Sequence, residues 1–281
     1  MIKKISIICL TYNNYSLLAK AIKSVGTQKV NDDLYMEIVV VDDCSTLFDY
    51  EYIESVLVET KINYKIIINE VNLGTVKAFN LAINNSCGEI IIPLSADDYF
   101  YKKTSIQTIV DMFNNTDYEV ISAMRHTQDK KEKTKLNTFF FMEEQDVLKF
   151  LLIRGNIISG ASTYYARSIF KKVGVFDEKY DLLEDYPFFI KILTLGMKIG
   201  RLKEETIDYS LNGVSNGEIN PRLLNDYNKL NQEILTRTDL SFFDKRKIQF
   251  NKVLTASDRR RVINFVLYID QYILYLLKKS Y

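Results

Sequence analysis

The chain has 281 residues, of which 47% are hydrophobic and 26% are charged, with a formal net charge of +1. This composition is that of an ordinary folded protein with enough chain for one large domain or two small ones. The near-neutral balance gives no electrostatic reason to expect a nucleic-acid partner.

The first hundred residues alternate between short apolar runs and amphipathic stretches. The predicted strands cover residues 4–10, 37–41, 64–68 and 89–94, and the predicted helices cover residues 16–27, 50–60 and 72–84. Strands that alternate with helices of this length indicate βαβ units and a mainly parallel sheet flanked by helices. Right-handed crossovers then place the carboxyl ends of all four strands at one edge.

The pattern is less regular after residue 100. The predicted helices cover residues 105–114, 144–152, 167–173 and 186–195, and the predicted strands cover residues 119–123, 197–202 and 206–211. The charged residues 128–135 are predicted to form a solvated loop. The turn-rich residues 212–217 predict a boundary, after which the chain is mostly helical.

Three cysteines, Cys9, Cys44 and Cys87, form an odd set, and Cys9 lies inside an apolar run. This usage argues against a disulfide framework and favours a reducing compartment. The first apolar run is too short for a secretory signal, and no uninterrupted apolar stretch reaches the roughly 20 residues of a membrane span. We therefore expect a cytoplasmic protein.

Polar side chains follow each of the first four predicted strands. They are Thr11, Tyr12, Asn13 and Asn14 after the first strand, Asp42 and Asp43 after the second, Asn72 after the third, and Asp97 and Asp98 after the fourth. Open α/β sheets bind ligands at this edge. Carboxylate oxygens suit Mg²⁺ or Mn²⁺, and such a cation suits a diphosphate. The alternative is that Asp97 and Asp98 cap the next helix.

Five short segments carry a resemblance to a known family. They are residues 6–14 (SIICLTYNN), 40–45 (VVDDCS), 72–80 (NLGTVKAFN), 94–98 (LSADD) and 184–185 (ED). In this order they resemble the inverting family 2 glycosyltransferases, which have the α/β GT-A (Rossmann-like) fold. The resemblance covers residues 4–215. It implies a catalytic domain over residues 1–215, with a nucleotide-binding half of about 1–100 and an acceptor half of about 101–215, and a helical extension over 216–281.

The resemblance also implies which residues hold the nucleotide. Tyr12 resembles the residue that stacks on the donor base. Asp42 resembles the carboxylate that accepts a hydrogen bond from uracil N3–H, which implies a UDP-sugar. Lys77 stands where the family often has Arg, and it would meet the diphosphate as a point charge. The residues expected at the nucleotide are Thr11, Tyr12, Asn14, Asp42, Asn72, Gly74, Lys77, Ser95, Ala96 and Asp98. The alternatives are an Asx-turn for Asp43 and a solvated helix lysine for Lys77.

The family's metal motif has two aspartates separated by one residue. Here the first position is Ser95 and the second is Asp97, so the resemblance implies a single protein carboxylate for Mn²⁺ or Mg²⁺. Asp185 resembles the catalytic base that deprotonates the acceptor hydroxyl. Glu184 beside it either binds the acceptor or raises the pKa of the base by its like charge. The alternative is that Asp185 caps a helix.

The segment 262–277 has apolar residues at helical spacing, with arginines at residues 259–261 before it and lysines at residues 278–279 after it. A basic amphipathic helix can lie on an anionic membrane, which would suit a lipid-linked acceptor and a peripheral location at the inner face of the cell membrane. The favoured alternative is packing against the catalytic domain or a second subunit, as in a homodimer.

The expected partners are a nucleotide-sugar donor and a glycan or lipid-linked glycan acceptor, in the synthesis of a cell-surface polysaccharide. Two other functions stay open. One is a non-catalytic nucleotide-sugar-binding or scaffolding module, because Ser95, Ser210 and Asn212 depart from the family pattern. The other is a nucleotidyltransferase, although residues 11–14 lack the glycines expected of its signature loop.

Overall fold

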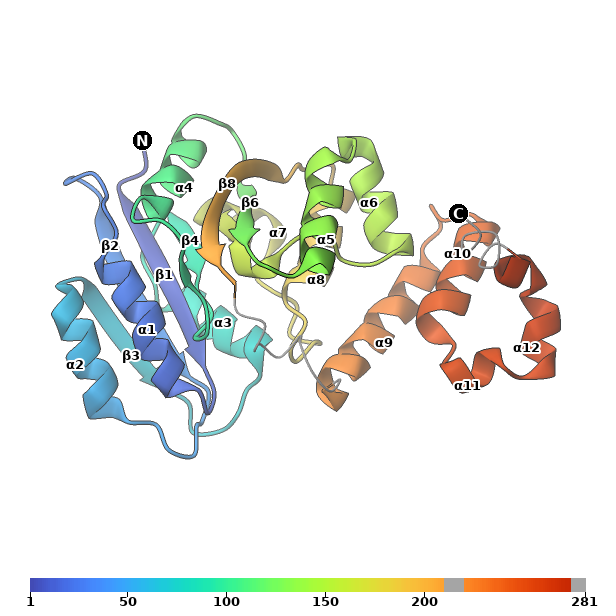
Figure 1. The fold of residues 1–281 in the computed structure, drawn as a ribbon, viewed down its shortest axis with the longest axis horizontal. Coiled ribbons are helices and arrows are strands. Elements are labelled where there is room, and N and C mark those ends of the chain that lie inside the picture. Colours follow the sequence, from blue (N-terminus) through green and yellow to red (C-terminus); the bar gives the residue numbers. More distant parts are fainter. Residues whose placement is uncertain (210–219, 274–281) are drawn as a thin grey trace.

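The computed structural model describes residues 1–209 and 220–273. In these residues eight strands form one sheet, in the order β3–β2–β1–β4–β7–β6–β8–β5 (Figure 1). The strands are β1 (Lys4–Thr11), β2 (Tyr35–Asp42), β3 (Asn63–Ile68), β4 (Ile90–Pro93), β5 (Tyr99–Phe100), β6 (Val120–His126), β7 (Thr163–Ala166) and β8 (Gly200–Asp208). The fold is α/β, as predicted.

The helices surround this sheet and continue beyond it. The helices that precede β8 in the chain are α1 (Tyr15–Gly26), α2 (Tyr50–Thr60), α3 (Thr75–Asn84), α4 (Ser105–Asn114), α5 (Lys130–Phe141), α6 (Glu144–Ile153), the short η1 (Gly160–Ser162), α7 (Arg167–Val173) and α8 (Asp185–Thr194). The C-terminal helices are α9 (Pro221–Thr236), α10 (Phe242–Ile248), the π-helical η2 (Gln249–Val253), α11 (Ala256–Arg259) and α12 (Val262–Leu267).

The first four strands are parallel, because β1 pairs with β2 and β4, and β2 pairs with β3, in the same direction. Their carboxyl ends therefore lie at one edge, as the sequence predicts. The second half of the sheet is mixed, since β7 runs antiparallel to β4 and β6 while β8 runs parallel to β6.

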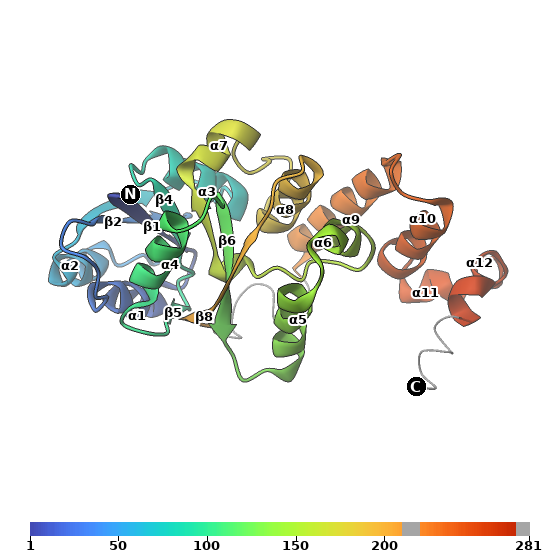
Figure 2. The same ribbon diagram turned by 90° about the horizontal axis from the view of Figure 1, so that it is seen from above.

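The core has two layers, one on each face of the sheet (Figure 2). The side chains of β1 alternate between them, as period-two geometry requires. Ile5 and Ile7 pack in the layer that contains buried residues of α1, α2 and α4, whereas Ile8 packs in the layer that contains those of α3, α6, α7 and α8. Leu230 of α9 and Ile248 of α10 belong to this second layer, so the C-terminal helices share the main core.

The predicted loop over residues 128–135 is wrong, because the helix α5 begins there. Asp129 caps it by accepting hydrogen bonds from the backbone N–H groups of Lys131 and Glu132. The helical spacing of apolar residues is not evident in the first half of α5, which is charged. The buried apolar residues, among them Leu136 and Phe139, come only in the second half. The sequence signal that predicts this helix is Asp129, because aspartate is a common N-cap residue.

The two strands predicted over residues 197–202 and 206–211 are also wrong, because one strand, β8, spans the interval between them. Its polar middle contains the exposed Lys203 and Glu204. The register against β6 shifts beside Met124, which is typical of a β-bulge. A bulge interrupts the apolar alternation without ending the strand.

The C-terminal helix predicted over residues 262–277 is interrupted in the structure. The helix α12 ends at Leu267, Tyr268 forms a turn, and helical residues resume over 269–273. The apolar side chains of α12 are exposed, with Val262 at 79% and Val266 at 64% exposure. These exposed side chains of α12 therefore do not pack against the catalytic part of the chain, whereas packing against a second subunit, the other half of the favoured alternative, stays a prediction.

Candidate functional site

The ends of β1 and β2 lie directly side by side, with Thr11 opposite Asp42 in the register. Both residues are buried. The carboxylate of Asp42 accepts hydrogen bonds from the backbone N–H and the hydroxyl of Ser45. The hydroxyl of Thr11 has no hydrogen-bond partner within the described structure, which is uncommon for a buried polar atom. This strand edge therefore contains a buried polar atom that a ligand could satisfy.

Asp43 holds the loop between β3 and α3. Its carboxylate accepts hydrogen bonds from the backbone N–H groups of Leu73 and Gly74, each at 2.8 Å, and from the side chain of Asn69 at 2.8 Å. Its backbone carbonyl accepts one from the side chain of Asn72. Asp43 therefore bridges two loops rather than forming an Asx-turn of its own, and the local turn belongs to Asp42.

Three residues expected at the nucleotide are more accessible. Tyr12 is 54% exposed, so its ring face is available for stacking. Asn14 stands at the N-cap position of α1 and is half-buried. Lys77 is exposed on the first turns of α3. The structure brings all three to elements that begin at the strand edge, and their roles at a donor stay predictions.

The end of β4 carries Ser95, Ala96, Asp97 and Asp98. Ser95 is exposed, Asp97 is half-buried, and Ala96 and Asp98 are buried. The next element along the chain is the strand β5, and the next helix, α4, begins after Thr104. The interpretation of this acid pair as a helix cap is therefore wrong.

Asp97 and Asp98 line a cavity of about 260 Å³ at the end of β4. The residues around it are Leu17, Lys20, Asp97, Asp98, Tyr99, Asp208 and Tyr209. The ammonium group of Lys20 lies 3.9 Å from the centre of the Tyr99 ring. Lys20 and Asp208 are residues that motif reasoning missed, because each stands alone in its element and only the fold brings them to this cavity.

One side chain at this end of the sheet, the carboxylate of Asp97, is suited to bind a hard cation. Burial raises the pKa of Asp97 above its ordinary value, and a backbone hydrogen bond offsets this only in part, so a nearby cation would stabilise the charged form. The described residues include no group of three or more His, Cys, Asp or Glu side chains placed to hold a metal ion. Asp97 alone could hold Mg²⁺ or Mn²⁺ only together with substrate phosphates and water, which is how Mg²⁺ is commonly bound.

Glu184 and Asp185 stand at the start of α8, on a different part of the edge. Asp185 is the first helical residue, and the N-cap position is Glu184, which makes no side-chain cap bond. One oxygen of Asp185 accepts a hydrogen bond from the side chain of Asn156 at 3.1 Å, and the other from the N–H of Tyr186 at 2.6 Å. The interpretation of Asp185 as an N-cap is therefore off by one position.

Gly160 fits closely against this carboxylate. A Cβ atom at Gly160 would lie 2.6 Å from the Oδ2 atom of Asp185, so no other residue fits there without moving the acid. Asn156 and Gly160 thus fix the orientation of Asp185 from the segment between α6 and β7. Both were absent from the motif analysis, since neither residue type is distinctive in a polar stretch.

The acid pair is electrostatically coupled. Burial and the charge of Asp185 raise the pKa of Glu184 to about 8. Burial also raises the pKa of Asp185, against the opposing effects of the Tyr186 N–H, the positive charge of Lys135 and the Asn156 amide. Burial and the like charge of its neighbour thus make Glu184 bind a proton more readily than an ordinary glutamate does.

Replacing Glu184 by glutamine should change how stability depends on pH. The folded-state pKa of about 8 lies above the ordinary value of 4.5, so the folded chain loses stability as pH rises from about 4.5 through 8. Each unit of pKa shift corresponds to about 1.4 kcal/mol. We expect urea denaturation at pH 6 and pH 9 to show a smaller loss in Glu184→Gln than in the original chain. Glu51→Gln, on the exposed start of α2, should keep the original loss, and an equal loss in all three proteins would contradict the assignment.

Two consecutive residues of β7, Tyr164 and Tyr165, are buried in different core layers. Burial raises the pKa of Tyr164, with a further rise from the charge of Asp98, and burial raises the pKa of Tyr165, with further rises from the charges of Asp185 and Glu184. Each acid pair therefore lies within electrostatic range of one side chain of β7.

Two predicted site features cannot be placed. Ser210 and Asn212, the positions where the family often has Arg and His, lie outside the described residues, as does the boundary predicted at 212–217.

The sole histidine, His126, stacks on Tyr101 with ring centres 4.4 Å apart, and its Nδ1 lies 3.4 Å from Glu205. His126 is thus a half-buried residue with an aromatic neighbour and an acidic neighbour.

The fold resembles those of solved glycosyltransferases. One is the Staphylococcus aureus protein TarS, residues 1–349, in complex with UDP-GlcNAc, with a TM-score of 0.63 and 21% identity over 87% of this chain and 70% of that one. Another is a mannosyltransferase from Pyrobaculum calidifontis in complex with GDP-Man and Mn²⁺, with a TM-score of 0.58 and 16% identity over 98% of this chain and 81% of that one. At these identities the likeness concerns the fold.

Sequence comparison points the same way. An uncharacterized glycosyltransferase of Nostoc sp. is 31% identical over 223 residues, which are 76% of this chain and 66% of that protein. The poly(ribitol-phosphate) beta-N-acetylglucosaminyltransferase TarS of S. aureus is 33% identical over 102 residues, which are 36% of this chain but 17% of TarS. The chain thus spans less than two thirds of the length of either relative. Residues 6–174, more than half of the chain, match the family described as Glycosyl transferase family 2. The chain belongs to this family of glycosyltransferases.

Proposed function

We propose that the protein transfers a sugar from a nucleotide-diphosphate sugar, most simply a UDP-sugar, to a hydroxyl group of a glycan or lipid-linked glycan, with inversion at the anomeric carbon. The observation that carries the proposal is the half-buried carboxylate of Asp185 at the start of α8, which is held in place by hydrogen bonds from the side chain of Asn156 and the N–H of Tyr186. A general base needs a carboxylate that is held in a fixed orientation. The solved complexes of TarS with UDP-GlcNAc and UDP support the choice of donor.

The proposed reaction is a single displacement. Asp185 accepts the proton of the acceptor hydroxyl as its oxygen forms a bond to the anomeric carbon, and the bond from that carbon to the diphosphate breaks on the opposite side. The exposed ring of Tyr12 and the exposed side chain of Lys77 on α3 would hold the nucleotide. Asp97 would hold Mg²⁺ or Mn²⁺ together with donor phosphates, and the cation would supply neutralisation of the charge that grows on the leaving diphosphate.

The test is release of UDP or GDP from a panel of nucleotide sugars, with Mn²⁺, with Mg²⁺ and with a chelator, in the presence of candidate glycan acceptors. We expect metal-dependent release with at least one UDP-sugar. Binding of nucleotide sugars without turnover of any of them would favour a non-catalytic binding module. That outcome would agree with the exposed Ser95, which replaces the first acid of the metal motif.

We also propose that the C-terminal end of the chain contacts an anionic membrane surface on the cytoplasmic side. The exposed apolar residues Val262, Ile263, Phe265, Val266 and Leu267 of α12 follow two exposed arginines, Arg260 and Arg261. Apolar side chains beside positive charge are complementary to anionic lipid headgroups over acyl chains. Within residues 1–209 and 220–273, no helix has the length and apolar character needed to cross a membrane. Such contact would bring the site to a lipid-linked acceptor.

Sedimentation with lipid vesicles tests this contact. We expect the protein to pellet with phosphatidylglycerol vesicles and much less with phosphatidylcholine vesicles. Arg260→Ser with Arg261→Ser should weaken partitioning by about thirtyfold, at about 1 kcal/mol per arginine. Leu47→Ser, which removes an equally exposed apolar side chain from another surface, should have no effect. Equal pelleting with both lipids, or a concentration-dependent dimer that Val266→Ser abolishes, would argue against the membrane and for a homodimer.

A further inference from the structure

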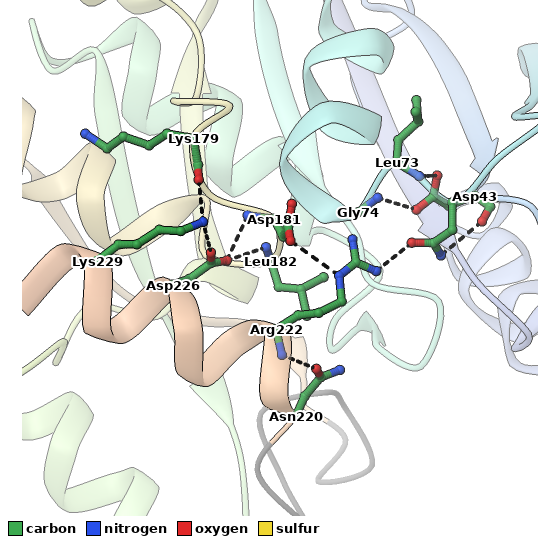
Figure 3. A network of polar contacts seen from close by, with 11 residues as sticks. Asp43, Leu73, Gly74, Lys179, Asp181, Leu182, Asn220, Arg222, Asp226 and Lys229 are labelled. Carbon is green, nitrogen blue, oxygen red and sulfur yellow. Dashed lines mark hydrogen bonds and ion pairs between the residues drawn. The ribbon is translucent and has the colours of Figure 1, made fainter.

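The first turns of α9, in the C-terminal helices, lie between two loops of the candidate site. One loop, residues 72–74, joins β3 to α3 and is expected at the nucleotide. The other, residues 181–182, comes directly before the acid pair Glu184 and Asp185. Figure 3 shows a continuous set of polar contacts that joins both loops to α9.

Asp226 of α9 binds the loop that precedes the acid pair. Its side chain is fully buried, and one of its oxygens accepts hydrogen bonds from the backbone N–H groups of Asp181 and Leu182, each at 2.8 Å. The ammonium group of Lys229 lies 3.5 Å from the other oxygen. A buried carboxylate is retained at little cost only where such donors surround it, so this contact defines the position of the loop.

Arg222, one helical turn before Asp226, contacts both loops. Its Nη1 atom donates a hydrogen bond to the side chain of Asn72 at 2.7 Å, and its Nε atom lies 3.5 Å from the carboxylate of Asp181. The planar guanidinium has several donors in a fixed arrangement, so a single side chain can hold two partners at once. Arg222 therefore joins the loop expected at the nucleotide to the loop before the acid pair.

The two loops also touch each other directly. The carbonyl oxygen of Asp181 accepts a hydrogen bond from the N–H of Val76, in the first turn of α3, at 3.1 Å. A Cβ atom at Gly74 would lie 2.6 Å from this carbonyl oxygen and 2.9 Å from Arg222, and the φ of Gly74 is +82°. Both the close approach and the backbone conformation therefore require glycine at this position.

Lys252 of η2 makes a second contact between the C-terminal helices and α8. Its ammonium group donates hydrogen bonds to the carbonyl oxygen of Leu152 at 2.9 Å and to the hydroxyl of Tyr186, next to Asp185, at 3.2 Å. Burial lowers the pKa of Lys252 to about 8. The loop before α8 is thus held by α9, and the start of α8 is held by η2.

We propose that Arg222 and Asp226 are positioning residues that set the acid pair at a fixed distance from the donor nucleotide. This role rests on the proposed sugar transfer, in which Asp185 must lie within hydrogen-bond reach of the acceptor hydroxyl. Through these two side chains, binding of a nucleotide at residues 72–74 would affect where Glu184 and Asp185 lie. A misplacement of about 1 Å at a reacting group can lower a rate by about a hundredfold.

The first experiment removes the arginine, which is partly exposed and can be replaced without opening the core. In Arg222→Ala we expect kcat to fall by at least about tenfold and the Kd for UDP to rise, because both loops lose a contact. Arg237→Ala is the matched control, since Arg237 directly follows the same helix and its contacts with Asp239 and with Thr194, at the far end of α8, lie away from both loops. A kcat of Arg222→Ala within twofold of that of the control would overturn the proposal.

The second experiment separates positioning from simple stability. Asp226→Ala removes the acceptor of both N–H groups, whereas Asp226→Asn keeps an oxygen that can accept them. We expect Asp226→Ala to lower kcat by at least about tenfold with an unchanged Kd for UDP, and Asp226→Asn to restore most of the rate. A lowered melting temperature with unchanged kcat in the folded fraction would mean a structural role alone.

Amide hydrogen exchange tests the contact without any turnover. The N–H groups of Asp181 and Leu182 should exchange at least about tenfold faster in Asp226→Ala than in the original chain, while Gln232→Ala, at an exposed position of the same helix, should leave them unchanged. Unchanged exchange rates overturn the positioning role whatever the substrate is. If these groups exchange faster in Asp226→Ala but the original chain turns over no nucleotide sugar, the proposed function is refuted. The contact between Asp226 and the loop is then still supported.

Discussion

Replacing Asp185 by asparagine should lower kcat by about 10²- to 10⁴-fold, the range that general base catalysis contributes. Asparagine keeps the size of the side chain, and its amide oxygen can still accept one of the two hydrogen bonds that Asn156 and the Tyr186 N–H donate to Asp185. It cannot take the proton of the acceptor hydroxyl. The Kd for the donor should therefore stay within about twofold, so the loss should appear in kcat and not in binding.

The measurement is the initial rate of UDP release at saturating donor, with donor binding followed by calorimetry. Asp177→Asn is a suitable control, because Asp177 is a carboxylate near the same helix that pairs with Lys179. A variant Asp185→Asn that turns over at the original rate would remove Asp185 from the mechanism. Loss of donor binding together with the rate would place it in the binding site instead.

Replacing Asp97 by asparagine should raise the metal concentration needed for half-maximal turnover by about tenfold or more. The reason is that Asp97 is the only acid at the two positions of the metal motif. Without it, the donor phosphates would be the charged ligands of the cation at this motif, and water would be the neutral ligand. The rise should be seen in a titration with Mn²⁺ at a fixed concentration of donor. The cavity that Asp97 lines contains Asp98 and Asp208 as well, and these should retain part of the affinity.

The complementary change is Ser95→Asp, which supplies the missing first acid. Ser95 is exposed, so the new carboxylate meets no packing barrier. We expect Ser95→Asp to lower the metal concentration at half-maximal turnover, opposite in direction to Asp97→Asn. If neither variant changes the metal titration, the cation is held elsewhere or is not used.

Local patterns predicted the first half of the fold well, because each element there carries its own signal. The apolar run of β1, the glycine that begins α3 and the acids after β4 each lie within a few residues of the element that they mark. The parallel order follows from the handedness of the crossovers rather than from any long-range contact. The errors fall where a local signal is masked, as in the charged start of α5 and the bulged middle of β8.

The candidate site was predictable only in its motif residues. Asn156, Gly160 and Lys135 reach Asp185 from segments that are 25 to 50 residues earlier in the chain, and nothing in their own neighbourhoods marks them. Arg222 lies 150 residues from Asn72, to which it donates a hydrogen bond. Contacts of this kind depend on how helices pack, and no period or motif in the sequence encodes them.

The shared core of the C-terminal helices has a consequence for how the protein can be handled in the laboratory. Leu230, Ile234 and Ile248 fill the same apolar layer as the helices beside the acid pair. A shortened gene product that stops where the family match ends, at residue 174, or at residue 215 would leave that layer open to water and prone to aggregation. Expression vectors for crystallography, isotope labelling or domain exchange should therefore carry the chain at least through residue 253, and fusion partners are better placed before Met1 than after α8.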